Sequence, residues 1–314
     1  MKKLLLYSLL LMLLAACTSL DSKEKNNKDE NVLLRNASPV PVSSPYHLKW
    51  PTTVYPLPPD LKEISGLGVI NNNTAACVQD EEGAIFMMNL TTGEINKKIP
   101  FSGKGDYEEI ALVGNDAYIM ESSGYIFHVT DYMTSTQPQV NRIATGLDKK
   151  SNAEGICYDK KNNRLLISCK GKSEEEEKNK KAIYAFDLST KQLSSEPVIQ
   201  LTEAEIKKAI TRVKPVRTGK SLDKALRSDK IDDLFTPSGL AIHPRTGELY
   251  VLSTQNNLLA VLDMQGNINE VYPLTHELFT QPEGIGFTAN GDMYISNEGQ
   301  KGMGNILKFS YEKK

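Results

Sequence analysis

Glutamate and serine side chains recur in one short phrase of this chain, at a spacing that would bring them together. The phrase is a Ser or Glu followed by Gly (once by Glu) and then by an aliphatic residue. Repeats of about 40–50 residues are typical of propeller blades, which place equivalent residues in a ring around an axis. Three carboxylates are therefore predicted near one mouth of a central channel. The polar positions, separated by 43, 46, 84 and 45 residues, are Ser65, Glu108, Glu154, Ser238 and Glu283.

Such a ring of carboxylates predicts a bound cation. Clustered carboxylates repel one another unless a cation neutralises them or some of them bind protons. Ca²⁺ suits such a ring because it accepts roughly six to eight oxygen ligands in irregular geometry. Zinc is disfavoured, since the His and Cys residues show no ligand spacing. The alternative is that these carboxylates only bond backbone amides around a wet channel. The predicted calcium ligands are the ring carboxylates and two neighbours: Glu108, Glu109, Glu154, Glu283 and Glu63.

Each phrase opens a unit with the pattern of a propeller blade. An apolar segment is followed by a turn of Asn, Asp or Gly and then by further short apolar segments, as in 75–78 and 84–89. Gly, Asn and Asp favour tight turns between strands. Four short antiparallel strands per repeat predict an all-β fold, a five-bladed β-propeller. The last repeat lacks an outer strand, which residues 47–57 are expected to supply, so that the ring closes without an exposed edge.

The long step between Glu154 and Ser238 contains only one set of blade strands. We assign the remainder to two insertions in the third blade. Residues 170–181 form a charged loop, and residues from about 197 to 235 form a helical insert over one face, opened by a capping box at 202–205. Its basic residues either are solvated or meet a phosphate or carboxylate ligand. The blade strands are complete without this insert, so its removal is expected to leave a folded propeller.

The N-terminus has the features of a bacterial lipoprotein signal. A basic start precedes an apolar run at 4–14, and Leu14-Ala15-Ala16-Cys17 resembles the lipobox, whose cysteine carries lipid. The alternative is an ordinary signal peptide with an incidental cysteine. We predict a signal peptide at 1–17 with lipidation of Cys17, a flexible tether at 18–46 and the propeller at 47–314. The expected location is the cell envelope, as an outer-membrane lipoprotein facing the periplasm or the surface, with the lipid bilayer as partner.

Composition excludes some partners and predicts the state of the cysteines. A net charge of −2 offers no basic surface for nucleic acid. No internal segment reaches the ~18 apolar residues of a spanning helix. Three cysteines remain after Cys17, and the offset of Cys157 from Cys169 across their hairpin disfavours a disulfide. We expect all three to be buried thiols.

The repeat phrases also carry a family resemblance. Ile64-Ser65-Gly66-Leu67, Tyr107-Glu108-Glu109-Ile110 and Pro282-Glu283-Gly284-Ile285 resemble the SdiA-regulated family of exported bacterial proteins, over residues 50–312. The resemblance implies a five-bladed propeller, distantly similar to NHL-repeat propellers, with a calcium site. This chain departs from the pattern at Glu109, where other repeats have Gly, and in its long helical insert.

For function, we predict a binding or scaffold module with an unknown small-molecule or protein ligand. The alternative is a calcium-dependent hydrolase, because similar-looking calcium propellers include phytases, lactonases and esterases. No G-x-S-x-G elbow is present, and Ser65 and Ser238 precede glycines inside repeats. His128 and His243 are candidate bases, but both lie in or beside predicted strands, where a structural role is expected. No catalytic residue is assigned.

Overall fold

The computed structural model describes residues 44–171, 179–212 and 220–312. Every described residue belongs to one compact unit, Val42–Lys314. The lipobox at Cys17, most of the predicted tether (18–43) and the tip of the charged loop (172–178) lie outside the described residues. Within the described ranges, no helix has the length and apolar character needed to cross a membrane.

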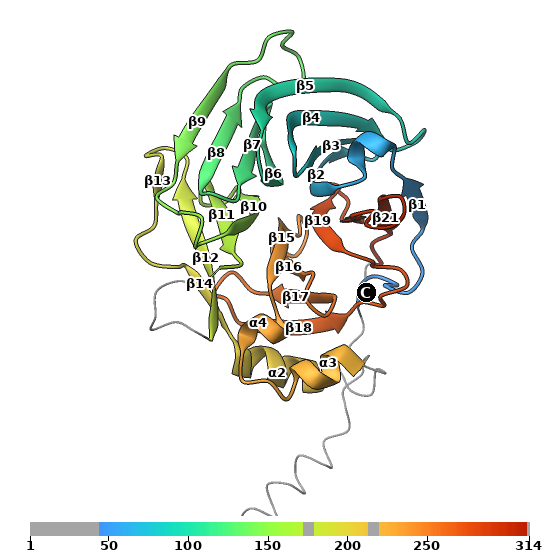
Figure 1. The fold of residues 1–314 in the computed structure, drawn as a ribbon, viewed down its shortest axis with the longest axis vertical. Coiled ribbons are helices and arrows are strands. Elements are labelled where there is room, and N and C mark those ends of the chain that lie inside the picture. Colours follow the sequence, from blue (N-terminus) through green and yellow to red (C-terminus); the bar gives the residue numbers. More distant parts are fainter. Residues whose placement is uncertain (1–43, 172–178, 213–219, 313–314) are drawn as a thin grey trace, which may run out of the picture. The chain divides into compact units, whose positions relative to one another are not determined.

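Five antiparallel sheets surround a central axis, and each sheet is one blade (Figure 1). The predicted five-bladed all-β propeller is confirmed. The first blade contains β2 (Ile64–Asn71), β3 (Thr74–Gln79), β4 (Glu82–Asn89) and β5 (Ile95–Lys104). The second contains β6 (Tyr107–Val113), β7 (Asp116–Glu121), β8 (Tyr125–Val129) and β9 (Val140–Ala144). The third contains β10 (Ala153–Asp159), β11 (Arg164–Cys169), β12 (Lys180–Asp187), β13 (Gln192–Leu193) and β14 (Ile199–Thr202). The fourth contains β15 (Pro237–Ile242), β16 (Leu249–Ser253), β17 (Leu258–Leu262) and β18 (Ile268–Pro273).

The fifth blade joins the two ends of the propeller. It contains β19 (Pro282–Phe287), β20 (Met293–Asn297), β21 (Asn305–Phe309) and, from the start of the propeller, β1 (Thr53–Pro56). β1 pairs with β21 in antiparallel register, with Val54 opposite Leu307, so the outer strand expected from residues 47–57 is confirmed. Tyr46, in the segment predicted as tether, is already 3% exposed, and its hydroxyl donates to the carbonyl of Gly291 at 2.7 Å. A 3₁₀ turn, η1 (Pro59–Leu61), then leads into β2.

The first strand of every blade lies innermost, and β2, β6, β10, β15 and β19 contact one another around the axis (Figure 1). All five carry a register shift at the repeat phrase, where each pairs with the second strand of its blade. A β-bulge bends its strand and changes where the side chains point. The repeated phrase therefore marks a repeated bulge, which presents its polar residue at the channel mouth.

The helical insert contains α2 (Glu203–Arg212), α3 (Lys220–Ala225) and α4 (Ile231–Leu234). The predicted capping box is present, because the Glu205 amide donates to Thr202 Oγ1 at 3.3 Å and the Thr202 amide donates to Glu205 Oε2 at 3.0 Å. The insert begins at Glu203 rather than near residue 197, since β14 pairs with β12 as part of the third blade.

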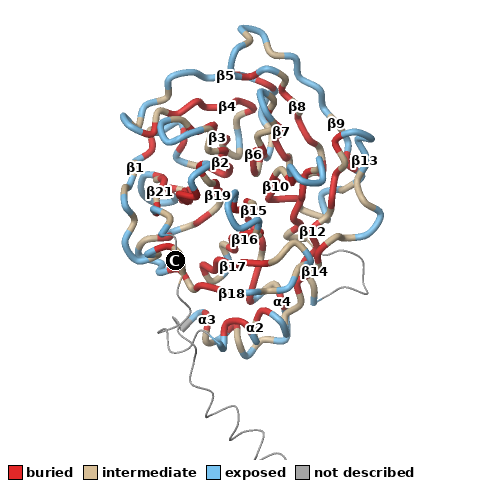
Figure 2. Tube along the Cα trace, turned by 180° about the vertical axis from the view of Figure 1, so that it is seen from behind, coloured by how far each residue is buried: buried red, intermediate tan, exposed pale blue. Residues whose placement is uncertain are grey.

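The insert lies along the outer edge of the propeller, beside β14 and β18, and not over a face as predicted (Figure 1). Buried stretches of α2 alternate with exposed ones, as expected for a helix with one side against the blades (Figure 2). Because the insert completes this core, the expectation that it is dispensable conflicts with the structure. Its apolar side chains within the core between the third and fourth blades are Ile206, Ala209, Ile210, Leu222, Ala225, Ile231 and Leu234.

Three cysteines are described, and all three are free and buried, as predicted: Cys77, Cys157 and Cys169. In the hairpin that holds two of them, Tyr158 lies opposite Leu165 and Ala153 lies opposite Cys169. The cysteines are therefore offset along the two strands. Burial raises the pKa of Cys169 to about 12, so its thiol stays protonated at neutral pH.

Candidate binding site at the channel mouth

Each blade places three polar positions at the mouth, and the repeat phrase supplies only one of them. The other two are the residue just before the first strand and the residue just after the second strand. Backbone hydrogen bonds join these two in four blades, as from the Lys170 amide to the Asn152 carbonyl at 2.9 Å. The residues before the first strand are Glu63, Asp106, Asn152, Thr236 and Gln281. The residues after the second strand are Asp80, Ser122, Lys170, Thr254 and Glu298.

These positions make the mouth strongly acidic. Together with the repeat-phrase residues they hold seven carboxylates and one ammonium, whereas the whole chain has a net charge of only −2. The mouth therefore concentrates negative charge that the rest of the surface balances. A recess lined by one sign of charge raises the local concentration of ligands of the opposite sign.

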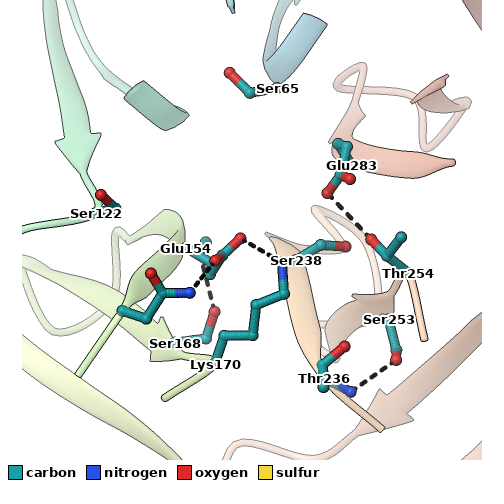
Figure 3. Close-up of polar contacts among 12 residues, drawn as sticks. Ser65, Ser122, Glu154, Ser168, Lys170, Thr236, Ser238, Ser253, Thr254 and Glu283 are labelled. Atoms are coloured by element: carbon teal, nitrogen blue, oxygen red, sulfur yellow. Dashed lines mark hydrogen bonds and ion pairs between the residues drawn. The ribbon is translucent and has the colours of Figure 1, made fainter. Parts of the chain in front are cut away.

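Glu154 is the most buried carboxylate of the repeat-phrase ring, at 4% exposure. Lys170, which follows β11, extends toward it, and its Nζ lies 3.3 Å from Glu154 Oε2 (Figure 3). The side-chain amide of Asn152 donates to the other oxygen at 2.6 Å. Lys170 is thus a built-in counter-ion, and the nearby Glu154, Glu283 and Glu108 raise its pKa against the opposing effect of burial.

Glu108 retains a proton at neutral pH. Burial, followed by the charges of Glu154 and Asp106, raises the pKa of Glu108 well above its usual range. The pKa of Glu154 is raised by burial too, although Lys170 and a hydrogen bond with Glu108 oppose this rise. The two carboxyls therefore titrate as a pair that shares one proton.

Glu283 lies on the other side of the mouth and is half-buried (Figure 3). Thr254 Oγ1 donates to its Oε2 at 3.1 Å, and Gln281 Nε2 donates to its Oε1 at 3.0 Å. Burial raises the pKa of Glu283 to about 7, with Lys170 opposing the rise and Glu154 adding to it. This carboxyl therefore exchanges its proton around neutral pH, so a nearby charge readily changes its protonation.

The two serines of the repeat phrase hold neighbouring blades together. Ser65 Oγ donates to the carbonyl of Tyr107 at 2.6 Å, which joins the first and second blades. Ser238 Oγ donates to the carbonyl of Pro282 at 3.1 Å, which joins the fourth and fifth. Both hydroxyls are buried in these bonds. Their position is explained by packing between blades.

The two candidate histidine bases also have structural surroundings. His128 Nε2 lies 2.8 Å from Asp116 Oδ2, and its ring stacks on Tyr118 at 4.3 Å between centroids. His243 is fully buried, and its ring lies 5.8 Å from that of Tyr250. Burial lowers the pKa of His243. The His128 ring is therefore occupied within its own blade. The His243 ring also packs against the fifth blade, with its centroid 4.9 Å from those of Phe287 and Tyr311. Both histidines have the structural role that the sequence led us to expect.

Glu109 and Glu63 differ from the ring carboxylates in what they contact. The Glu109 carboxyl is 1% exposed inside the channel, where its Oε1 accepts the amides of Leu67 at 2.7 Å and Ile110 at 3.0 Å. Glu109 therefore behaves as the alternative prediction describes, by bonding backbone amides. Glu63 is half-buried just before β2, and its charge adds to burial in raising the pKa values of Asp80 and Glu298.

The carboxylates of the mouth are spaced apart and partly balanced by other groups. Among the described residues, no three Asp, Glu, His or Cys side chains converge closely enough to hold a metal ion. The ammonium of Lys170 lies beside Glu154, and protons reduce the charge on Glu108 and Glu283. Ca²⁺ would need roughly six to eight oxygen ligands around one point. Protonation, the second route that the sequence left open, relieves part of the repulsion in the metal-free protein, and calcium binding stays a prediction.

A family profile identifies the family of this chain. The profile of the SdiA-regulated family matches residues 50–301. The chain belongs to the SdiA-regulated family. The comparison with curated protein sequences gives no match for this family member.

Solved structures share the propeller of this family member at low sequence identity. Glutaminyl cyclase from Myxococcus xanthus is similar with a TM-score of 0.54 and 13% identity, over 83% of this chain and 95% of that one. A streptogramin B lyase is similar with a TM-score of 0.44 and 12% identity, over 82% of this chain and 97% of that one. The likeness to the glutaminyl cyclase shows the fold, and the activities in both names remain properties of those proteins.

Proposed function

We propose that this family member is a binding module whose channel mouth binds a ligand with a positively charged ammonium or guanidinium group. The supporting observation is the excess of seven carboxylates over the single ammonium of Lys170 at the mouth. An N–H donor of a cationic ligand makes strong, charge-assisted hydrogen bonds to carboxylates. Such a ligand needs only one or two carboxylate partners, whereas Ca²⁺ needs a complete oxygen shell.

Glu108 and Glu283 are the carboxyls with unused capacity for this ligand. Both are half-buried and accessible, and both have a raised pKa. A cation placed beside them favours their ionised forms and lowers those pKa values. Binding therefore strengthens as the pH rises through the pKa of Glu283 at about 7.

Calorimetric titration tests this proposal with N-acetylarginine amide and its neutral analogue N-acetylcitrulline amide. We expect the arginine compound to bind at least about tenfold more tightly, which is about 1.4 kcal/mol, with affinity increasing from about pH 6 to about pH 8. Glu283→Gln should weaken binding by a similar factor, because it removes the titrating carboxylate. Glu94→Gln, at an exposed turn, should leave binding unchanged. Equal affinity for both compounds, or equal loss in the two variants, contradicts the proposal.

Calcium binding stays a prediction, and the same calorimetric experiment tests it with Ca²⁺ as the titrant. If the mouth were a calcium site, titration with Ca²⁺ would give a binding isotherm, the melting temperature would rise, and Ca²⁺ would compete with the arginine compound.

An assay of the same protein for turnover of phosphoesters and lactones, with and without calcium, tests the hydrolase alternative. Turnover that is lost in Glu283→Gln would replace the binding proposal with an enzymatic one.

We also propose that the module is exported and anchored to the outer membrane by lipid on Cys17. The support is the lipobox-like sequence that ends at this residue. Cys17→Ala should move the protein from the membrane fraction to the soluble envelope fraction, because one lipid-modified residue supplies the anchor. Fractionation with immunodetection measures this shift. Persistence of the variant in salt-washed membranes would contradict the anchor.

A further inference from the structure

One position of the mouth differs in charge from its equivalents in the other blades. Lys170 follows the second strand of the third blade. The residues that follow the second strands of the other blades are acidic or neutral, and they are Asp80, Ser122, Thr254 and Glu298. A carboxylate at this position allows the same backbone bond to the residue before the first strand, as from the Glu298 amide to the Gln281 carbonyl at 3.0 Å. The blade therefore does not require a lysine here.

Hydrogen bonds on both sides hold the main chain of Lys170 in place. Its amide donates to the carbonyl of Asn152 at 2.9 Å, and its carbonyl accepts Lys181 Nζ at 2.5 Å. Lys181 is itself fixed, because it is 1% exposed and its Nζ also donates to Asp232 Oδ1 of α4 at 2.6 Å. The helical insert thus helps to fix the point from which the Lys170 side chain extends.

The ammonium of Lys170 fills one cation position in the mouth, at Glu154. Its Nζ lies 3.3 Å from Glu154 Oε2, and Figure 3 shows the side chain extended toward this carboxylate. Its charge also reaches carboxyls of the second and fifth blades. Burial raises the pKa of Glu108, Glu283 and Glu298, and the charge of Lys170 opposes that rise in each of them.

A second cation position, at Glu283, is open. The two oxygens of Glu283 accept hydrogen bonds from neutral side chains, those of Thr254 at 3.1 Å and Gln281 at 3.0 Å. Within the part of the chain that the structure describes, no ammonium or guanidinium forms an ion pair with this carboxyl. The mouth thus has one position filled by the protein's own cation and one left for a ligand.

We propose that Lys170 sets the charge selectivity of the mouth, so that it accepts a ligand with one cationic group and gains little from a second. This inference rests on the proposed cation binding and narrows its ligand class to compounds with a single amine or guanidinium group. A second ligand cation would have to share Glu154 with the Lys170 ammonium, and such a built-in like charge is a general source of specificity.

Calorimetric titration with n-butylamine, 1,4-diaminobutane and 1,6-diaminohexane tests this inference. Alkylammonium groups keep their protons at about pH 8, and about 0.15 M salt screens the long-range attraction that favours any dication. We expect the wild type to bind either diamine at most about threefold more tightly than butylamine, a margin that allows for the two equivalent ends of a diamine. Lys170→Met should bind the better diamine at least about tenfold more tightly than butylamine, because the second ammonium can then bind Glu154.

Three further variants separate selectivity from folding. Lys170→Gln also removes the charge and should give the same result as Lys170→Met, whereas Lys170→Arg keeps the charge and should keep the wild-type ratio of affinities. Lys160→Met removes a charge from the exposed turn at the other end of the β10–β11 hairpin and should also keep that ratio. Melting curves establish that each variant is folded. A role of Lys170 in folding alone would leave the ratio unchanged.

The outcomes distinguish this inference from the proposed function on which it rests. If butylamine binds but the preference for a diamine is the same in the wild type and in the folded charge-removing variants, the selectivity inference is overturned and cation binding stands. If neither the wild type nor the variants bind any of the three amines, both are overturned.

Discussion

Replacing residues 203–234 with a short Gly/Ser link is expected to abolish the soluble, cooperatively unfolding propeller. The deletion removes seven buried apolar residues from the core between the third and fourth blades. Burial of one aliphatic side chain contributes about 1.5–3 kcal/mol, so the loss is on the order of 10 kcal/mol, comparable with the whole stability of a domain. Circular dichroism melting and size-exclusion chromatography of the deletion protein measure this outcome.

A point variant tests the same coupling without removing the insert. Lys181 is 1% exposed, and its Nζ donates to Asp232 Oδ1 of α4 at 2.6 Å and to the Lys170 carbonyl at 2.5 Å. Asp232→Asn should destabilise the protein by about 1–2 kcal/mol, because it removes a half-exposed carboxylate from its ion pair with the buried Lys181 ammonium. Asp229→Asn, at an exposed position, is the matched control and should have little effect.

For the deletion of residues 203–234, a protein that melts like the wild type would show that the insert is dispensable.

Glu108→Gln is expected to stabilise the propeller above neutral pH by about 2 kcal/mol and to flatten its dependence on pH. In the wild type, the raised pKa of Glu108 and that of Glu283, at about 7, mean that the folded state holds protons that the unfolded state releases. Below their ordinary pKa of 4.5, these two carboxyls make their full contribution to the free energy of unfolding. That contribution is lost as the pH rises through the pKa values that the groups have in the folded state. Glutamine cannot ionise, and it can still donate a hydrogen bond to Glu154.

Urea unfolding at several pH values measures this effect. The wild type should lose stability between about pH 5 and about pH 8, and Glu108→Gln should lose less. Glu94→Gln, at an exposed turn, should follow the wild-type curve. A Glu108→Gln protein that is less stable than the wild type at pH 8 would mean that the ionised carboxylate stabilises the fold.

The repeat phrase predicted the fold and the ring because it contains the positions that every blade must share. A polar residue, then usually glycine, then an aliphatic residue fits a bulge at the start of an innermost strand, and the same bulge occurs in all five blades. The closing strand was predictable too, since the last repeat supplies only three strands of a four-stranded blade.

Lys170 was missed because its place depends on the register of a second strand. It follows Cys169, which lies opposite Ala153, so it reaches the mouth beside Glu154. The equivalent position in other blades is also polar, as at Thr254 and Glu298. This second series of polar residues was present in the sequence. Comparing the residue after each second strand would have found it.

The calcium prediction, which stays untested, counted formal charges, and burial changes the charges of these carboxyls in the metal-free protein. A half-buried carboxyl such as Glu283 binds a proton near neutral pH, and Lys170 partly neutralises Glu154 without any metal. The role of Glu109 was equally hidden, because only the folded channel brings its carboxyl to the amides of Leu67 and Ile110. Charge patterns in a sequence therefore locate such a site better than they identify its ligand.

Proton release on ligand binding tests the central claim most directly, that the mouth is a partly protonated carboxylate cluster open to an organic cation. Calorimetric titration of N-acetylarginine amide near pH 7, repeated in buffers of different ionisation enthalpy, gives the number of protons released per ligand bound. Because a cation lowers the pKa values of Glu283 and Glu108, we predict a release of roughly half a proton to one proton, reduced in Glu283→Gln. Binding without proton release, or no binding, would contradict the account.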